Sequence, residues 1–255
     1  MKELSLSEKV ALVLGVEHPT GRAIAVALAE AGADVACVAT SPRREAEVAA
    51  NSCANEVWAV GRRALALAID PLDEGQVEGA VDRTVRELGR LDILVNAHDV
   101  PYAAPVEETT TERFRRVLEG NLTAVYLACR AAARVMLAQG KGRIVNVLPL
   151  LAERGLANAS AYCAAKGGVL NLTRALALEW ARRGVAINAL GCGWVEGEGL
   201  VQDPETKAQL ERYLPYRRLA RPDELAGAAV YLASDAADFV TGQVIWVEGG
   251  ALSHV

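Results

Sequence analysis

Residues 142–168, GRIVNVLPLLAERGLANASAYCAAKGG, contain an aliphatic run, a loop and the start of a helix. The run at 143–148 predicts a buried strand. Tyr162 and Lys166 are four positions apart, so they share one face of the helix that follows. A nearby ammonium lowers the pKa of a phenol, which allows Tyr162 to act as a general acid or base near neutral pH. The same spacing also arises by chance, so the surrounding sequence must decide whether the pair is catalytic.

Apolar runs alternate with helical patterns on both sides of this stretch. Besides 143–148, strands are predicted at residues 9–14, 34–40, 63–70, 92–96, 184–190 and 243–247. Helices are predicted at residues 22–33, 42–61, 74–89, about 107–138, 160–183 and 222–233. Continuous apolar strands separated by helices indicate a parallel sheet covered on both faces. We therefore expect residues 1–255 to form a single-domain α/β Rossmann fold, a doubly wound seven-stranded parallel sheet with helices on both faces.

Composition excludes several classes of protein. The net charge of −5 and the pI near 5.4 argue against a nucleic-acid or anionic-membrane surface. Five cysteines without a C-x-x-C pair indicate free thiols in a reducing compartment, so we expect a cytoplasmic protein. Three dispersed histidines give no metal site, and no apolar run is long enough to span a membrane.

Candidate functional residues follow the predicted strands. In a doubly wound sheet the ligand lies beyond the carboxyl ends of the strands, where the strand order reverses. Residues 15–21 follow the first strand and open a helix, which suits a dinucleotide pyrophosphate. Asp70, Asn96 and Pro149 come at the ends of three further strands. The sequence therefore predicts a ligand site at this edge of the sheet.

Taken together, these positions resemble the short-chain dehydrogenase/reductase family over nearly the whole chain. The family motif T-G-x-x-x-G-x-G matches residues 14–21, N-N-A-G matches residues 96–99, and Y-x-x-x-K matches Tyr162 and Lys166. The late P-G motif falls on residues 192–193, and TGQVIWVEGG is similar to the final strand and turn of the family.

The resemblance implies a carbonyl/alcohol oxidoreductase that transfers a hydride to or from NAD(P)(H). Tyr162 would exchange a proton with the substrate oxygen, and Lys166 would lower the tyrosine pKa and hold the nicotinamide ribose. Asn121 would order a water in the proton relay. Pro149 and Trp194 would face the substrate, which the family resemblance suggests is a hydroxy- or oxo-compound such as a sugar acid, a steroid or an oxoacyl group.

The resemblance also assigns a cofactor site. Its expected residues are Gly15, His18, Thr20, Gly21, Thr40, Ser41, Arg43, Asp70, Asn96, Tyr162, Lys166 and Val195. The end of the second strand carries no acid, whereas its hydroxyls and two arginines suit a 2′-phosphate, which favours NADP(H) over NAD(H). The alternative is that these arginines are ordinary solvated residues at a helix start.

Several motif positions depart from the family pattern. Pro149 stands where the family has a serine that donates to the substrate oxygen, and Pro19 replaces the second glycine. Asp99 replaces a glycine and either hydrogen-bonds the nicotinamide ribose or repels a phosphate, and Cys192 replaces a proline. These substitutions have two explanations: they are neutral changes at loop positions that tolerate them, or they reshaped the site together. The alternative function is a catalytically impaired dinucleotide-binding scaffold or sensor.

Residues 194–220 are expected to form a lid over the substrate. Trp194, Leu200, Leu214 and Tyr216 would make this lid apolar. By resemblance, the chain is expected to form a homo-oligomer, a dimer or a tetramer. The alanine-rich helices within residues 121–138 and 160–183 offer faces suited to symmetric pairing.

Overall fold

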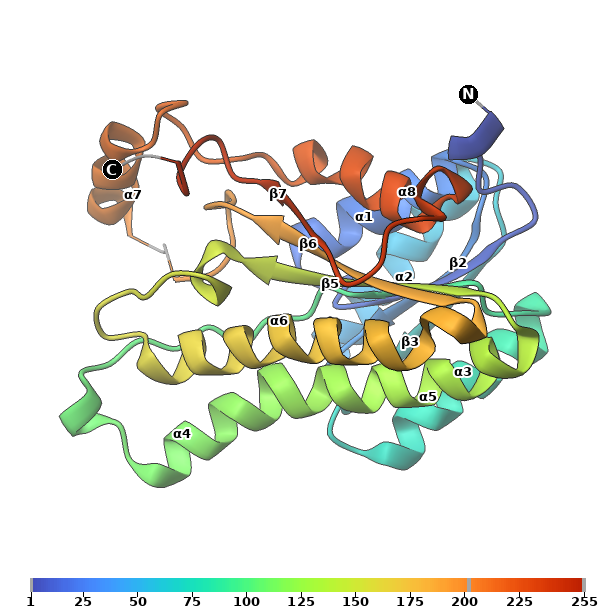
Figure 1. Ribbon diagram of the computed structural model, residues 1–255, viewed down its shortest axis with the longest axis horizontal. Coiled ribbons are helices and arrows are strands. Elements are labelled where there is room, and N and C mark those ends of the chain that lie inside the picture. The colour runs from blue at the N-terminus through green and yellow to red at the C-terminus, as the bar shows by residue number, and fades with distance from the viewer. Residues whose placement is uncertain (1, 201–202, 254–255) are drawn as a thin grey trace.

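Seven parallel strands form one sheet in the order β3-β2-β1-β4-β5-β6-β7 (Figure 1). The computed structural model describes residues 2–200 and 203–253. The strands are β1 (Val10–Leu14), β2 (Asp34–Ala39), β3 (Ala64–Ala68), β4 (Ile93–Asn96), β5 (Gly142–Pro149), β6 (Val185–Cys192) and β7 (Val244–Val247). The order reverses between β1 and β4, so the predicted doubly wound sheet is confirmed, and its ligand-binding edge lies at this reversal.

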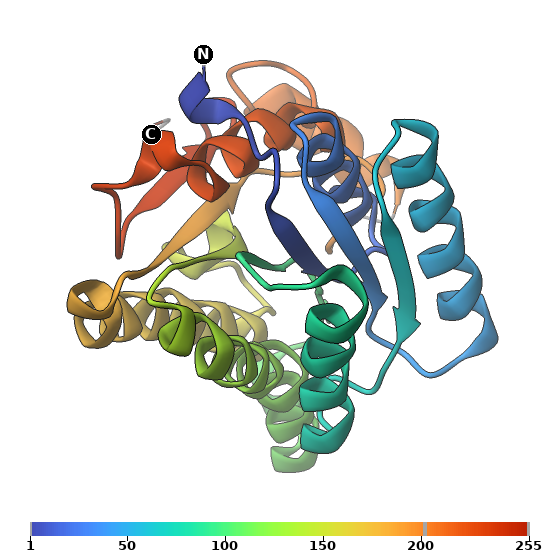
Figure 2. The ribbon, with the colours of Figure 1, turned by 90° about the vertical axis from the view of Figure 1, so that its right-hand side faces the viewer.

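Helices cover both faces of the sheet (Figure 2). They are α1 (Pro19–Glu30), α2 (Arg44–Ala59), α3 (Glu74–Leu88), α4 (Thr111–Leu118), α5 (Ala124–Gln139), α6 (Ser160–Trp180), α7 (Pro204–Tyr213) and α8 (Ala226–Ala233). Helices α3, α5 and α6 pack on one face, and α1, α2 and α8 pack on the other.

The strands are buried because successive side chains enter two different cores. Leu12 and Leu14 of β1 pack against the α3, α5 and α6 side, whereas Ala11 and Val13 pack against the α1, α2 and α8 side. This alternation is the two-residue period of a strand. A strand that faces helices on both sides must be apolar at every position, which explains the continuous runs in the sequence.

The predicted helix at 107–138 starts later and is interrupted. Its first turn begins at Thr111, because the Thr110 side chain accepts a hydrogen bond from the Arg113 amide and so caps α4. A π-helical turn at Glu119–Thr123 then joins α4 to α5. Such turns insert one extra residue into a helix and often occur at functional sites.

Helix α7 lies inside the expected lid and was not predicted. Asp203 caps it by accepting from the Thr206 amide, and Pro204 occupies its first turn. Both residues are common signals for a helix start. Residues 201–202 of the expected lid lie outside the described residues.

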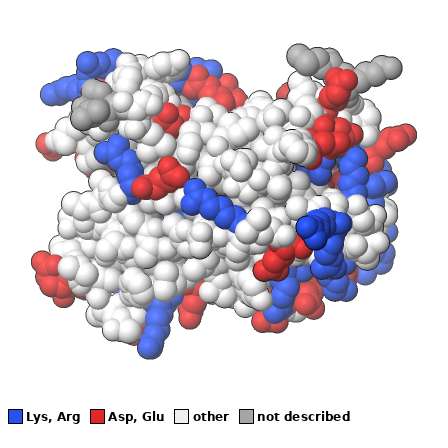
Figure 3. Space-filling view, in the orientation of Figure 1, with Lys and Arg blue, Asp and Glu red and all other residues white. Residues whose placement is uncertain are grey.

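Other features of the described chain bear on the class of protein. No helix within residues 2–200 and 203–253 is long and apolar enough to cross a membrane. All five cysteines are free thiols. On the face drawn in Figure 3, acidic and basic side chains are intermingled. A basic surface for nucleic acid is therefore not seen on that face.

Candidate active site

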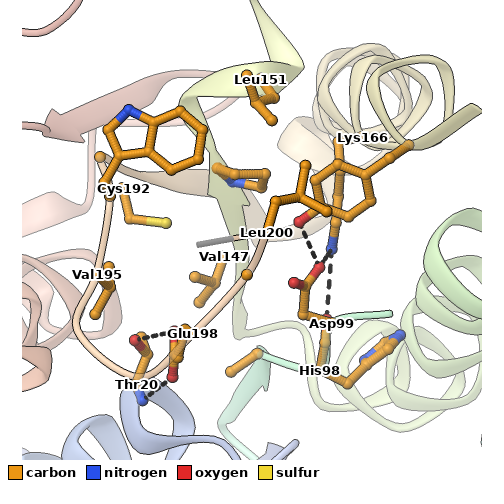
Figure 4. A pocket seen from close by; sticks show the side chains of 16 residues that line it. Thr20, His98, Asp99, Val147, Leu151, Lys166, Cys192, Val195, Glu198 and Leu200 are labelled. Carbon is orange, nitrogen blue, oxygen red and sulfur yellow. Dashed lines mark hydrogen bonds and ion pairs between the residues drawn. The ribbon is translucent and has the colours of Figure 1, made fainter. Parts of the chain in front are cut away.

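An open cavity with about 550 Å³ of empty space lies at the carboxyl ends of β1, β4, β5 and β6. Thr20, His98, Asp99, Tyr162, Lys166 and Glu198 supply its main polar groups (Figure 4). Its apolar lining includes Val147, Pro149, Leu151, Trp194, Val195 and Leu200. The cavity therefore combines a polar floor with an apolar wall at the edge where a ligand was expected.

Tyr162, Lys166 and Asp99 meet in the polar part of the cavity. Helix α6 carries the tyrosine and the lysine one turn apart, and Asp99 comes from the loop after β4. The Tyr162 hydroxyl donates to the Asp99 carboxylate at 2.7 Å, and Lys166 Nζ lies 2.8 Å from the same carboxylate oxygen (Figure 4). Lys166 Nζ also lies 3.5 Å from the His98 carbonyl oxygen. A single carboxylate oxygen thus holds both members of the predicted pair.

This arrangement changes the expected acidity of the tyrosine. Burial and the adjacent Asp99 carboxylate raise the pKa of Tyr162 well above its ordinary value. Burial alone would raise the pKa of Asp99, but Lys166 and the two hydrogen bonds bring that pKa below its ordinary value. The prediction that Lys166 lowers the pKa of Tyr162 is therefore wrong for this structure, because the ammonium is paired with Asp99 instead.

Burial also determines the charge of His98. Burial, reinforced by the nearby Lys166 ammonium, lowers the pKa of this histidine to about 3. The imidazole is therefore neutral at physiological pH. Lys166 is consequently the cationic side chain among the described residues that line the cavity.

The amino-terminus of α1 holds a carboxylate from the chain itself. Glu198 accepts hydrogen bonds from the Thr20 amide and from the Thr20 hydroxyl, the latter at 2.7 Å (Figure 4). His18, at the N-cap position, makes no side-chain cap, and Pro19 occupies the first turn as expected. Unpaired amides and the helix dipole make such a terminus a site for anions. The Glu198 carboxylate stands in for a phosphate here, so these donors fit a dinucleotide pyrophosphate.

Glycines bring the loop and α1 close together. A Cβ atom at Gly21 would lie 2.2 Å from the Gly15 carbonyl oxygen, and Gly15 itself has a φ of +93°. Larger residues at either position would force the loop away from the helix. The two glycines that the sequence retains are therefore the two that the backbone requires.

A third carboxylate, Glu17, lies at the end of β2. Its Oε1 atom accepts from the Thr40 amide at 2.9 Å and from the Thr40 hydroxyl. Ser41 and Arg43 lie next along the chain, and the Ser41 hydroxyl accepts from the Arg43 amide at 3.4 Å. Neither Glu17 nor Glu198 could be recognised from local sequence patterns, because their partners are distant in the chain.

Several expected site residues do not line the cavity, and three of them, Asn96, Asp70 and Asn121, make other contacts. Asn96 donates to Asn146 Oδ1 at 2.8 Å on the α5 side of the sheet. Asp70 accepts from the Leu72 amide in an exposed turn. Asn121 lies in the π-helical turn and bonds both the amide and the carbonyl of Val100, at 3.1 and 2.9 Å. Asn121 therefore holds the residue next to Asp99 in place.

The substrate-facing predictions divide between two cavities. Pro149, Trp194 and Leu200 line the cavity described above, as does Val195, which was predicted to contact the cofactor. Leu214 and Tyr216, expected in the same apolar lid, line a neighbouring cavity that also contains Trp194. The predicted lid segment thus borders two spaces with Trp194 between them.

A buried Tyr–Lys pair at this edge of a doubly wound sheet, beside a glycine loop that opens a helix, is the arrangement of a dinucleotide-dependent dehydrogenase. Residues 15–251 match a family profile described as enoyl-(acyl carrier protein) reductase. The chain belongs to the short-chain dehydrogenase/reductase family, as the motifs predicted.

Similar proteins agree with this membership. The cis-4-hydroxycyclohexanecarboxylate dehydrogenase of Sinomonas cyclohexanicum is 40% identical over 96% of this chain and 97% of its own length. The gluconate 5-dehydrogenase of Gluconobacter oxydans is 36% identical, covering 96% and 95%. A crystal structure of a gluconate 5-dehydrogenase from Burkholderia cenocepacia, in complex with NADP and tartrate, superposes with a TM-score of 0.91 at 34% identity, covering 99% and 98%.

These relatives bear on the two functions that the sequence left open. This chain is an oxidoreductase that interconverts CH–OH and C=O groups with a nicotinamide dinucleotide. The alternative, an impaired scaffold or sensor, is not favoured, because relatives that match over almost the full length are named dehydrogenases.

Proposed function

We propose that this enzyme acts on a small neutral alcohol or its carbonyl counterpart, with Tyr162 exchanging the proton. The observation that carries the proposal is the pairing of Tyr162 and Lys166 through Asp99 at the base of a largely apolar cavity. A phenol held in place by a hydrogen bond can transfer a proton to a bound oxygen with little rearrangement. Asn121 supports this role as a positioning residue through its bonds to Val100.

The direction of proton transfer follows from the acidity of Tyr162. A tyrosine with a raised pKa stays protonated at neutral pH, so it is ready to donate to a carbonyl oxygen. The phenolate left after donation would be stabilised by the Lys166 ammonium. We therefore expect Tyr162 to serve as the general acid when the enzyme reduces a carbonyl near neutral pH.

The cofactor would occupy the edge between α1 and α6. The Thr20 amide and hydroxyl would take the pyrophosphate in place of the Glu198 carboxylate. Lys166 would hold the nicotinamide ribose, with Gly15, Gly21 and Val195 shaping the site. The bound nicotinamide supplies or accepts the hydride. The other expected contacts, His18, Ser41, Arg43, Asp70 and Asn96, remain predictions, and the positions of Asp70 and Asn96 outside the cavity count against those two.

The charges of the cavity limit the substrate. Asp99 and Glu198 are acidic, and the ammonium of Lys166 is already paired with Asp99. A carboxylate placed beside these groups would meet like charge without a compensating cation among the described lining residues. Val147, Leu151 and Leu200 instead suit a hydrocarbon body. A neutral cyclic or branched alcohol fits this lining better than a sugar acid.

Several finer expectations accompany this proposal. Residues 194–220 would close over the substrate, since Trp194 and Leu200 already line the cavity. The enzyme would work in the cytoplasm as a dimer or tetramer through α5 and α6. The preference for NADP(H), based on Thr40, Ser41 and Arg43, is opposed by Glu17, which already bonds Thr40.

Replacing Tyr162 by phenylalanine tests the proposal directly. Loss of a general acid typically costs about 10²–10⁴ in rate, so Tyr162→Phe should lower kcat to near background. Dinucleotide affinity should stay within about twofold, because the hydroxyl alone is removed and general acid–base catalysis acts in the transition state. Turnover would be followed by nicotinamide absorbance with a panel of neutral ketones. Tyr126→Phe, at an exposed position on α5, is the matched control. Unchanged turnover in Tyr162→Phe would overturn the assignment.

A further inference from the structure

The glycine loop between β1 and α1 (residues 15–18) places the acidic side chain of Glu17 at the end of β2. The Gly15 amide donates to the Val38 carbonyl at 2.8 Å, so the loop runs directly beside this strand. Glu17, two residues later, reaches across to the Thr40 amide and hydroxyl. Its carboxylate is thereby fixed at the carboxyl end of β2 by two donors from one residue.

The second oxygen of this carboxylate has no partner. Glu17 Oε2 is buried and makes no hydrogen bond within the described structure. A buried acceptor without a donor is unfavourable, and such groups usually have a reason in ligand binding or function. Arg43 and Arg44, which follow β2, are exposed, and within residues 2–200 and 203–253 no ion pair involves Glu17. The atom is thus suited to accept from a hydroxyl that a ligand brings.

In doubly wound dinucleotide-binding folds, an acid near the end of the second strand accepts from the ribose 2′-hydroxyl of NAD. Here β2 ends in Ala39, followed by Thr40 and Ser41, with no acid of its own. Glu17 places a carboxylate at the same point from a different segment. The carboxylate at this point therefore comes from the loop rather than from the strand.

We propose that Glu17 determines cofactor choice, accepting the adenosine ribose 2′-hydroxyl of NAD(H) and rejecting the 2′-phosphate of NADP(H). The proposal rests on the proposed function, since it requires that the chain bind a dinucleotide. A phosphate at this point would meet a fixed negative charge. It would also find the Thr40 amide and hydroxyl already engaged. The solvated side chains of Arg43 and Arg44 offer only screened attraction in return.

Direct binding titrations test this without turnover. NADH and NADPH would be titrated into the parent protein, Glu17→Gln and Glu17→Ser, with nicotinamide fluorescence and calorimetry as readouts. The parent should bind NADH at least about 30-fold more tightly than NADPH, the size expected for one like-charge contact. Both variants should reduce that ratio to about threefold or less, mainly by tightening NADPH.

Two controls test whether a change in cofactor preference comes from Glu17 itself rather than from lost net charge or from misfolding. Glu45→Gln removes the same charge from an exposed position on α2 and should leave the ratio unchanged. Thermal unfolding would show that each variant is folded. If the Glu17 variants fail to fold, Thr40→Val provides a second route, because it removes one donor to the carboxylate and should lower the ratio partially.

Three outcomes would contradict the proposal, and they differ in what they say about the proposed function. A parent that binds NADPH as tightly as NADH would overturn the role of Glu17 while leaving the proposed reaction intact. Equal losses for both cofactors in Glu17→Gln would overturn it as well. A parent that binds neither dinucleotide would instead overturn the proposed function itself.

Discussion

Asp99 and Glu198 line the same cavity, yet they are held in opposite ways. Asp99 is bonded to Tyr162 and Lys166 of α6, and its neighbour Val100 is fixed by Asn121. Glu198 lies between two glycines with positive φ, and its carboxylate bonds to Thr20. The Asp99 carboxylate is therefore a fixed part of the cavity floor, whereas the Glu198 carboxylate occupies an anion site that a ligand can take over.

This difference predicts that Asp99 affects catalysis and that Glu198 affects cofactor binding. Removing Asp99 would leave Lys166, whose side chain is only 3% exposed, without its counterion. Removing Glu198 would free the amide and hydroxyl of Thr20 for another anion. Changes at the Asp99 end should therefore affect stability and the pH dependence of catalysis, while changes at the Glu198 end should affect cofactor affinity.

The largest effect is expected from a serine at position 149, which should change catalysis without changing cofactor binding. Pro149 offers no side-chain donor to a substrate oxygen, and one preorganised donor is typically worth about 10²–10³ in rate. We expect Pro149→Ser to raise kcat for carbonyl reduction by a large part of that factor, with little change in dinucleotide affinity. Pro149→Ala controls for the loss of the ring. Equal rates in both variants would mean that the hydroxyl cannot reach the substrate.

Asp99→Asn is expected to have the next largest effect. Breaking a buried ion pair by removing one partner typically costs about 3–5 kcal/mol of stability. Because Asp99 is partly exposed, we expect a loss of about 3 kcal/mol in the free energy of unfolding. The pKa of Tyr162 should fall, because its charged acceptor is gone and Lys166 is free to stabilise the phenolate. Urea unfolding and an absorbance titration of the phenolate would measure the two effects.

A surface pair provides the control for Asp99. Asp82 pairs with Arg134, and both side chains are more than half exposed. Asp82→Asn should therefore change stability by less than about 1 kcal/mol. An Asp99→Asn variant that unfolds at the same urea concentration as Asp82→Asn would contradict a stabilising role for Asp99.

Glu198→Gln should tighten dinucleotide binding. An anion at an exposed helix amino-terminus gains up to about 1 kcal/mol, so removing the internal competitor should improve affinity by about fivefold. Glu196→Gln, on the same loop and exposed, is the control. Weaker binding in Glu198→Gln would instead indicate that the carboxylate contacts the cofactor rather than competing with it.

Acid should reduce the contribution of Asp99 to stability. The pKa of Asp99 is depressed in the folded protein, so its contribution is present above the ordinary aspartate pKa near 4 and is lost as the pH falls through the lower folded value. The stability gap between the parent and Asp99→Asn should therefore begin to shrink as the pH falls below about 4. Urea midpoints measured at decreasing pH would show this change, and a constant gap would argue against an ionised Asp99.

Much of the fold was predictable because the sheet is buried on both faces. Every strand then appears as an apolar run, and the Tyr–Lys spacing follows directly from helical geometry. Helix α7 was missed although Asp203 and Pro204 signal its start, since its mixed composition resembles a loop.

The site was less predictable because its contacts join distant segments. Glu198 and Thr20 are separated by 178 positions, so no local pattern could pair them. Asn96 was misread for a different reason. It shares the strand face of Leu94, which packs toward α5, and strand alternation therefore turns Asn96 away from the cavity.

The π-helical turn at Glu119–Thr123 has a consequence for how the protein tolerates length changes. One residue of an α-helix advances the chain by about 100° around the helix axis. The extra residue therefore sets the phase of α5 separately from that of α4. Deleting it would rotate the alanines of α5 that pack against the sheet, including Ala128 and Ala132, away from their core. Insertions elsewhere in surface loops should be tolerated, but this segment behaves as a spacer of fixed length.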